Sequence, residues 1–224
     1  MISVIIPTLN EELALGKSLV LARNSKEVEI IVSDGGSDDD TLAIAKRLAD
    51  KVISSPAGRG VQMNRGAAAA SGDILIFLHA DTSLPADWDD LVRETLRDEE
   101  IAGGAFSFSL SDSSIPFSLI SLMVNIRSRL LKLPYGDQAI FARRALFEKL
   151  GGFREIPIME DVELVKGMRR LGRIKMLDLS VITSSRRWEK EGWIRTTVRN
   201  LFLLFLYHLG VSPERLYRFY KAVR

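Results

Sequence analysis

The chain has 224 residues, of which 46% are hydrophobic and 27% charged, with a formal net charge of +2. This composition excludes a disordered or fibrous protein and predicts a globular one, long enough to bury a full hydrophobic core in a single domain. Because there is no cysteine, disulfides, thiolate metal sites and cysteine nucleophiles are excluded.

The first half of the chain alternates short apolar runs with helical patterns. It begins with MISVIIPTLNEE, where no basic region precedes the apolar stretch, so we expect no signal peptide and a cytoplasmic protein. We expect strands at residues 2–7, 28–34, 51–55 and 73–81, separated by helices at 11–24, 37–50 and 60–72. Such alternation is typical of an α/β fold with a mostly parallel sheet covered by helices on both faces.

The second half has a mixed α+β pattern. We expect a half-buried strand at 103–110, where phenylalanines alternate with serines, and an amphipathic helix at 117–133. Residues 135–153 predict a loop, a strand and a short helix; a helix at 160–172 and a strand at 173–183 follow. We therefore predict one domain, 1–224, made of a nucleotide-binding half (1–100), a smaller mixed half (101–188) and C-terminal amphipathic helices (189–224).

Polar residues follow each expected strand of the first half. Since the carboxyl ends of parallel strands meet at one edge of a sheet, these residues are expected to lie together. They are Pro7, Thr8, Asn10 and Glu11, then Asp34, Gly35, Gly36 and Ser37, then Ala57, Gly58 and Arg59, then His79, Ala80 and Asp81. The turn after the first strand has no glycine and no Gly-Lys-Ser/Thr occurs, so neither a dinucleotide fingerprint nor a P-loop is present.

Each of these residues has a functional and a purely structural interpretation. Asp34 could accept a hydrogen bond from a base, and the glycines after it let the backbone approach a ribose. Arg59 could pair with a phosphate, and Asp81 could hold a divalent cation that bridges a diphosphate. The alternatives are a turn and helix cap at Asp34, a solvated loop position at Arg59 and a turn at Asp81.

Taken in order, five segments resemble the family 2 glycosyltransferases, which have the GT-A fold. They are VIIPTLNEE, IIVSDGGSDDDT, NRGAAAASGDILIFLHADT, GGFREIPIMEDVEL and SSRRW, all within residues 2–188. LHAD and GDQ are most similar to segments of small bacterial members of the family. The resemblance implies an inverting transfer of a sugar from a nucleotide-sugar donor, expected to be UDP-linked, to an acceptor hydroxyl, with no nucleic-acid partner.

The resemblance also implies roles for individual residues. Asp81 matches the last aspartate of the family's Asp-x-Asp, which binds Mg²⁺ or Mn²⁺ through the diphosphate. Asp161 matches the general base that deprotonates the acceptor, and Glu160, which precedes it, is the second catalytic candidate. Both open a helix, where the dipole favours ionised carboxylates. Without the other motifs, both would be read as ordinary first-turn acids. The donor site would be bordered by Pro7, Thr8, Glu11, Asp34, Gly35, Gly36, Arg59, Ala80, Asp81, Arg187 and Trp188.

Two positions depart from the family pattern. His79 replaces the first carboxylate of Asp-x-Asp; it could bind the ribose or the metal, or be satisfied by backbone. Ser184 stands where processive relatives have glutamine, which argues against processive synthesis, while Arg187 could support the leaving diphosphate and Trp188 could stack on an acceptor sugar. Asp137 and Gln138, in YGDQ, lie where the acceptor side is expected, with loop chemistry as the alternative.

The C-terminal segment is basic and partly apolar. Residues 186–224 hold nine Lys or Arg against three Glu, so they sum to +6 and the rest of the chain to −4. LFLLFLYHLGV has 11 residues, too few to cross a bilayer, which takes about 20. The segment could contact a membrane surface through residues 190–224, which suits a lipid-linked acceptor, with Arg195, Arg199, Arg215 and Arg218 near lipid phosphates. It could equally close the acceptor site, form a homodimer surface or dock with a solvated basic face.

Two other functions are compatible with parts of the sequence. A nucleotidyltransferase has a related sheet, but usually carries a glycine- and arginine-rich phosphate loop after its first strand, and PTLNEELALGK is not one. A catalytically impaired nucleotide-binding protein of the same fold is the second, because of His79 and Ser184.

Overall fold

The computed structural model describes residues 1–25 and 27–222. Its strands are β1 (Ile2–Thr8), β2 (Val28–Asp34), β3 (Lys51–Ser54), β4 (Ile74–Phe77), β5 (Thr82–Ser83), β6 (Ile101–Leu110), β7 (Ile140–Arg143) and β8 (Arg173–Thr183). Its helices are α1 (Glu12–Arg23), α2 (Thr41–Leu48), α3 (Arg59–Ala69), α4 (Trp88–Thr95), α5 (Ile115–Leu131), α6 (Arg144–Lys149), α7 (Glu160–Leu171), α8 (Arg186–Glu191), α9 (Trp193–His208) and α10 (Pro213–Ala222), with a 3₁₀ turn, η1 (Gly136–Gln138).

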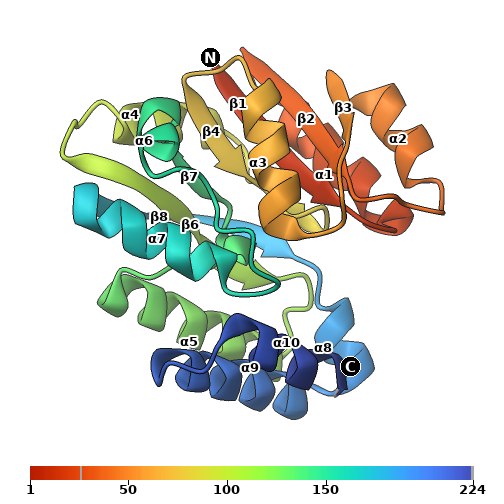
Figure 1. The fold of residues 1–224 in the computed structure, drawn as a ribbon, viewed down its shortest axis with the longest axis vertical. Helices are drawn as coiled ribbons and strands as arrows, with labels where there is room; N and C mark the ends of the chain where they lie inside the picture. The colour runs from red at the N-terminus through yellow and green to blue at the C-terminus, as the bar shows by residue number, and fades with distance from the viewer. Residues whose placement is uncertain (26, 223–224) are drawn as a thin grey trace.

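All these strands belong to one sheet, in the order β3-β2-β1-β4-β7-β6-β8-β5 (Figure 1). The first four strands pair in parallel, and β1 and β2 stay in register from Ile2 opposite Val28 to Thr8 opposite Asp34. Alternate residues of β1 face opposite layers: Val4 packs in the layer of α1, α2 and α4, whereas its neighbour Ile5 packs in the layer of α3. The expected parallel α/β sheet, covered on both faces, is confirmed.

The second half of the chain completes the same sheet. β7 pairs antiparallel with β4, from Ile74 opposite Arg143 to Phe77 opposite Ile140, and antiparallel with β6 on its other side. β6 in turn pairs in parallel with β8. Because β7 starts where β4 ends, the η1 turn that precedes β7 is brought beside the residues that follow β4.

Three expectations about single elements are wrong. The strand expected to be half-buried is buried along almost all of its length, because β6 lies inside the sheet and Ser107 donates to the Leu177 carbonyl at 2.7 Å. The strand expected to reach residue 81 ends at Phe77, so LHAD is a turn beyond it. The second helix begins at Thr41, not at residue 37. Neither α4 nor β5 was anticipated.

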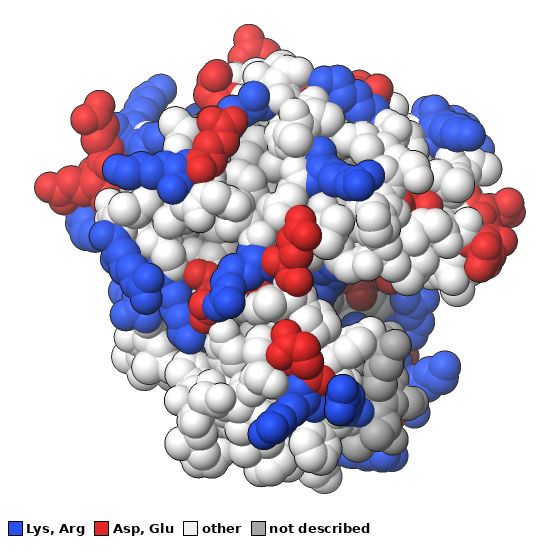
Figure 2. Space-filling model, viewed as in Figure 1, with Lys and Arg blue, Asp and Glu red and all other residues white. Residues whose placement is uncertain are grey.

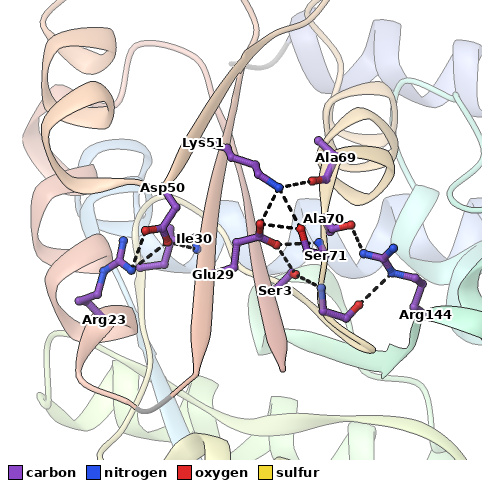
Figure 3. Close-up of polar contacts among 11 residues, drawn as sticks. Ser3, Arg23, Glu29, Ile30, Asp50, Lys51, Ala69, Ala70, Ser71 and Arg144 are labelled. Atoms are coloured by element: carbon purple, nitrogen blue, oxygen red, sulfur yellow. Dashed lines mark hydrogen bonds and ion pairs between the residues drawn. The ribbon is translucent and has the colours of Figure 1, made fainter.

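At the amino-terminal edge of the sheet, a network around Glu29 joins several elements (Figure 3). Its carboxylate accepts hydrogen bonds from Ser3 Oγ at 2.7 Å and from the Ser71 amide at 2.8 Å, and pairs with Lys51 Nζ at 2.6 Å. Burial alone would raise the pKa of Glu29, but these partners lower it to about 2. This edge is thus electrostatically compensated and ties β1, β2, β3 and the α3–β4 loop together.

Within the described residues, no helix is both long enough and apolar enough to cross a membrane.

Gly104 offers a test of the packing between β6, β7 and β8. A Cβ there would meet the Lys175 carbonyl oxygen and the Phe141 ring, whereas the nearest atom to a Cβ on Gly16, in α1, is the Ile44 Cγ2 at 3.8 Å. We expect Gly104→Ala to lower the free energy of unfolding by about 2 kcal/mol or more, because backbone must move. Gly16→Ala should be neutral or stabilising by up to about 1 kcal/mol.

Urea unfolding of both variants measures the difference. Equal stability of Gly104→Ala and the wild type would contradict the close approach of β6 to its neighbours.

Candidate active site

The strand ends of the first half and the start of α7 meet at the carboxyl edge of the sheet. This edge collects the turns after β1, β2 and β4, together with η1 and α8. The start of α3 joins it through Arg59, whose Nε lies 2.8 Å from Glu160 Oε1. The residues predicted from the strand ends are therefore brought together with the acidic pair that opens α7.

Asp34 organises the turn after β2. Its Oδ1 accepts from Thr8 Oγ1 at 3.0 Å and Ser37 Oγ at 2.6 Å, and its Oδ2 accepts from the amides of Gly36 and Ser37, each at 2.9 Å. Burial would raise the pKa of Asp34, but these donors hold it below its usual value. Protein donors thus occupy the lone pairs of both carboxylate oxygens, so the predicted contact with a base requires one donor to give way.

Gln62 is a site-building residue that sequence reasoning missed. Its buried amide donates to the carbonyls of Thr8 at 2.7 Å and Ser33 at 2.8 Å, and its Oε1 accepts from the Gly58 amide at 3.2 Å. It fixes the ends of β1 and β2 and the start of α3 relative to one another. A Cβ on Gly35 would lie 3.1 Å from its Nε2, so the backbone of Gly35 packs closely against Gln62. A glutamine in a small-residue helix gives no such signal in sequence.

The LHAD turn is held by its backbone. The Ala80 carbonyl accepts from Ser18 Oγ at 2.7 Å, and the Asp81 carbonyl accepts from the Ser184 amide at 3.0 Å. These bonds fix the turn between α1 and the β8–α8 connection and leave the half-buried Asp81 carboxylate at the edge of the sheet. Burial, and then the charge of Asp81, raise the pKa of Glu11, so the two carboxylates lie near each other.

His79 is a neutral imidazole in this arrangement. Burial, followed by the positive charges of Arg59 and Arg187, lowers its pKa to about 3. Its ring lies against η1, because a Cβ on Gly136 would be 2.8 Å from His79 Nε2 and 3.3 Å from Asp161 Oδ2. The residue that replaces the first carboxylate of Asp-x-Asp therefore adds no charge to the site, and a side chain at position 136 would require the His79 ring to shift.

The acidic pair that opens α7 is divided between two environments. Asp161 Oδ2 accepts from the Gly136 amide at 2.7 Å, so it is anchored beside the η1 turn. Glu160 is 1% exposed and is buried beside it, paired with Arg59. Burial raises the pKa of Glu160 to about 7, although Arg59 opposes this shift. The carboxylate of Asp161 is thus partly exposed, whereas the buried carboxylate of Glu160 forms an ion pair with Arg59.

Asp137 and Gln138 differ in their hydrogen bonding: Gln138 is bonded within the fold, whereas Asp137 has an oxygen that is unpartnered within the described chain. Gln138 is fully buried: its Oε1 accepts from Ser128 Oγ at 2.8 Å and its Nε2 donates to the Phe106 carbonyl at 3.1 Å. Asp137 Oδ1 is buried and has no hydrogen-bond partner among the residues described. Burial raises the pKa of Asp137 to about 6; Arg127 opposes the shift, and the charges of Asp161 and Asp81 add to it.

The SSRRW segment (184–188) leads into α8 and lies beside the LHAD turn, where the Ser184 amide donates to the Asp81 carbonyl. Arg186 pairs with Glu11, with Nη2 3.2 Å from Oε2, and Arg187 is close enough to influence His79, Glu11 and Asp137. Trp188 packs against a small apolar cluster that contains Phe108, Leu110, Phe117 and Ile120. This packing anchors α8; the predicted stacking of Trp188 on a sugar stays a prediction.

The donor chemistry of the edge fits a hard divalent cation that takes most of its ligands from a bound molecule. In the part of the chain that the structure describes, no three His, Asp or Glu side chains are grouped so that they alone could hold a cation. Asp81 nevertheless lies at the open edge, and Asp137 brings a buried, unpartnered carboxylate oxygen beside it. Carboxylate oxygens are the ligands that Mg²⁺ and Mn²⁺ prefer.

In open α/β sheets ligands bind at the carboxyl ends of the strands, which is where these carboxylates and arginines lie. The model of the family described as Glycosyl transferase family 2 matches residues 3–151, and the chain belongs to this family. A PGL/p-HBAD biosynthesis glycosyltransferase of Mycobacterium tuberculosis is 34% identical over 171 residues, covering 68% of this chain and 63% of the relative. The chain thus spans less than two thirds of the length of this relative.

Solved structures of glycosyltransferases share the fold. The mannosyltransferase PcManGT from Pyrobaculum calidifontis, in complex with GDP-Man and Mn²⁺, superposes with a TM-score of 0.70 at 21% identity, covering 94% of this chain and 64% of that one. Glucosyl-3-phosphoglycerate synthase from Mycobacterium tuberculosis, in complex with Mn²⁺, UDP and glucosyl-3-phosphoglycerate, gives 0.60 at 26% identity, covering 80% and 70%. The expected GT-A fold is confirmed.

Asp137 predicts a pH dependence of stability. Because its pKa rises from 3.8 to about 6 on folding, the native state holds this proton more tightly than the unfolded chain. The resulting stabilisation is present below about pH 4 and is lost as the pH rises through about 6. Asp137→Asn does not titrate, so it should gain stability relative to the wild type from about pH 4.5 to 8, by on the order of 1 kcal/mol.

Urea unfolding at several pH values measures this gain, with the exposed Asp90→Asn as the control. A constant difference between Asp137→Asn and the wild type across the range would contradict the buried, uncompensated state of Asp137.

Proposed function

We propose that the protein is an inverting, metal-assisted and non-processive glycosyltransferase that moves a sugar from a UDP-linked donor to an acceptor hydroxyl. The observation that carries the proposal is that Asp81, after β4, and Asp161, at the start of α7, both lie near the η1 turn: the Gly136 amide donates to Asp161, and both charges raise the pKa of Asp137. The two carboxylates can then act on opposite ends of the reacting bond. The UDP and GDP-Man bound to the two solved relatives support a nucleotide-sugar donor.

The donor side would be formed by the turns after β1 and β2. Asp34 keeps the Gly35–Gly36 backbone in a fixed turn, in which Gly36 has a φ of +92°, so that a nucleoside can approach the main chain closely. Thr8 is tied to Asp34, Pro7 lies at the end of β1 beside it, and Glu11 is held by Arg186. We assign these residues to the nucleotide and not to the transferred sugar.

The diphosphate would lie between Asp81 and two arginines. Mg²⁺ or Mn²⁺ bound through Asp81 would stabilise the negative charge that grows on the leaving nucleoside diphosphate. Arg187 and the partly exposed Arg59 supply further positive charge to the same region, and Arg59 is kept in place by Glu160. Neutral His79 adds no charge, and its role toward the ribose or the metal stays a prediction.

Asp161 would remove the proton from the acceptor. The Gly136 amide fixes Oδ2, and the carboxylate can then accept a hydroxyl proton while the oxygen attacks the anomeric carbon from the face opposite the leaving diphosphate. One displacement of this kind inverts the configuration. Glu160 would act from its buried position as a positioning residue for Arg59 and the start of α7.

The acceptor would enter past η1 and α8, where Asp137 and Trp188 lie. We propose transfer of single sugars, because Ser184 stands where processive relatives have glutamine. A lipid-linked acceptor, membrane contact through 190–224 and a homodimer are compatible with this site and stay predictions.

The metal and donor roles are tested by calorimetric titration with UDP, with and without Mn²⁺. We expect Mn²⁺-dependent binding to the wild type that Asp81→Ala reduces by about tenfold or more, because the protein ligand to the cation is lost. Asp90→Ala, an exposed carboxylate on α4, is the matched control and should bind as the wild type does.

Unchanged binding to Asp81→Ala would remove Asp81 from the site. If neither UDP nor GDP binds to the wild type, the proposed function is wrong.

The base role is tested by Asp161→Asn. We expect turnover of the nucleotide sugar to fall by about 10² to 10⁴, with UDP binding retained, because asparagine cannot accept the acceptor's proton. Glu163 lies in the same helix but pairs with Arg154 and Lys166, so the Glu163→Gln variant should keep the activity of the wild type.

The release of UDP that depends on a candidate acceptor gives the readout. Equal activity of Asp161→Asn and Glu163→Gln would contradict the assignment of Asp161 as the base.

A further inference from the structure

A large apolar surface lies on α5 and α9, away from the sheet. Of the 22 large hydrophobic side chains exposed in the described residues, 13 belong to these two helices, each between 42% and 85% exposed. The helices lie side by side at the end of the molecule opposite β1–β3 (Figure 1). We call this surface the α5–α9 face: Ile115, Leu119, Leu122, Met123, Ile126, Leu130 and Leu131 with Trp193, Ile194, Val198, Leu201, Phe202 and Phe205.

The exposed residues follow helical spacing on both helices. On α5 the stripe advances by three or four residues from Ile115 to Leu130, and on α9 it advances likewise from Ile194 to Phe205. Residues spaced in this way share one side of a helix. Each helix therefore presents a continuous apolar side to the outside, which scattered exposed residues of an ordinary surface do not.

Helix α9 buries polar side chains on its inner side and exposes aromatic side chains on its outer side. The side that it buries holds the apolar Leu203, but also Thr196, at 0% exposure, and Arg199, whose Nη1 lies 2.6 Å from Glu191 Oε2. The expectation that Arg199 lies near lipid phosphates is therefore wrong, because its side chain is buried. Its outward side carries Trp193, Phe202 and Phe205. Burying polar groups while exposing aromatic ones is unfavourable in water, so the arrangement indicates an apolar environment on the outer side.

The two helices of the α5–α9 face carry a net positive charge, although Arg129 pairs with Asp178 at 2.7 Å and Arg199 with Glu191 at 2.6 Å. Neither Ile115–Leu131 nor Trp193–His208 contains an aspartate or glutamate, and their cationic residues include Arg195 next to the α9 stripe. Lys132, exposed at the end of α5, adds another. In Figure 2 the lower part of the molecule, where these helices lie, is mainly white, with some basic and acidic side chains among the uncharged ones. An apolar surface rimmed by positive charge is complementary to anionic lipid and not to a second copy of itself.

We propose that the α5–α9 face lies flat on the surface of an anionic lipid bilayer, with its apolar side chains in the headgroup region and its basic rim on lipid phosphates. Both helices are too short to cross: 17 residues of α5 extend about 25 Å. An amphipathic helix of this length is suited to the interface.

The two helices are joined directly to the active-site segments. α5 leads through residues 132–135 into η1, and α8 leads through Gly192 into α9. The docked protein would therefore hold Asp137 and Arg187 close to the headgroups. This consequence for an acceptor at the membrane rests on the proposed function, whereas the docking itself does not.

The test is sedimentation of the full chain with vesicles of phosphatidylcholine containing about 30% phosphatidylglycerol, without nucleotide. We expect the protein to pellet with these vesicles and to bind pure phosphatidylcholine more weakly by at least about tenfold. It should be released from the anionic vesicles as NaCl rises from about 0.1 to 0.5 M. Since no donor is present, failure here leaves the UDP titration as an independent test of the proposed function.

Two variants report on the two parts of the surface. Phe202→Ser with Phe205→Ser should weaken binding by about tenfold or more by removing apolar area. Arg195→Gln with Lys132→Asn should weaken binding to the anionic vesicles and reduce its salt dependence. Asparagine is chosen at position 132 because Lys132 has a φ of +50°, a left-handed conformation that asparagine tolerates. Val20→Ser with Leu171→Ser removes exposed apolar side chains elsewhere and should bind as the wild type does.

Several results would overturn the proposal. Equal binding to neutral and anionic vesicles would do so, as would unchanged binding of the Phe202/Phe205 variant with an unaltered unfolding curve. A wild type that fails to pellet, but sediments as a dimer that the same variant dissociates, would assign the face to a second copy of the chain.

Discussion

The antiparallel pairing of β7 with β4 is the constraint on which the rest of the structure depends. It places a strand of the second half beside β4, the outermost of the four parallel strands of the first half, so that one sheet extends across both halves. It also fixes direction: β7 starts opposite the end of β4, and the η1 turn must lie beside the LHAD turn. The amide of Gly136 then reaches Asp161, and helix α7 is held against the strand ends. The site is thus a consequence of register in the sheet.

The pKa values of buried carboxylates shift in opposite directions at the two edges of that sheet. At the amino-terminal edge, Glu29 is surrounded by donors and Lys51, and its pKa falls to about 2. At the carboxyl edge, burial raises the pKa of Glu160 to about 7 and that of Asp137 to about 6. The first arrangement stabilises the fold. The second leaves negative charge under-compensated where the strands end, and an uncompensated buried charge is typical of a site that binds a cation or moves a proton.

The α5–α9 face is outside this electrostatic arrangement but shares its chain segments. The helices begin or end next to η1 and α8, so a change in what covers the face would reach the acceptor side of the site through very few residues. Their outward apolar stripes do not pack within the described chain, because these side chains are between 42% and 85% exposed. Sheet, site and outer surface are therefore linked by short connections.

The sequence by itself determined the elements whose pattern is local. Apolar runs predicted β1 and β2, the acidic start of α7 was recognisable, and ordered motifs indicated the family. Only the tertiary structure decided what depends on neighbours. β6 reads as half-buried yet lies inside the sheet; Gln62 has no sequence signal yet fixes two strand ends; and Asp34 is enclosed by donors from three other residues. Periodicity reports how one segment meets water, whereas burial and hydrogen bonding depend on which distant segments pack against it.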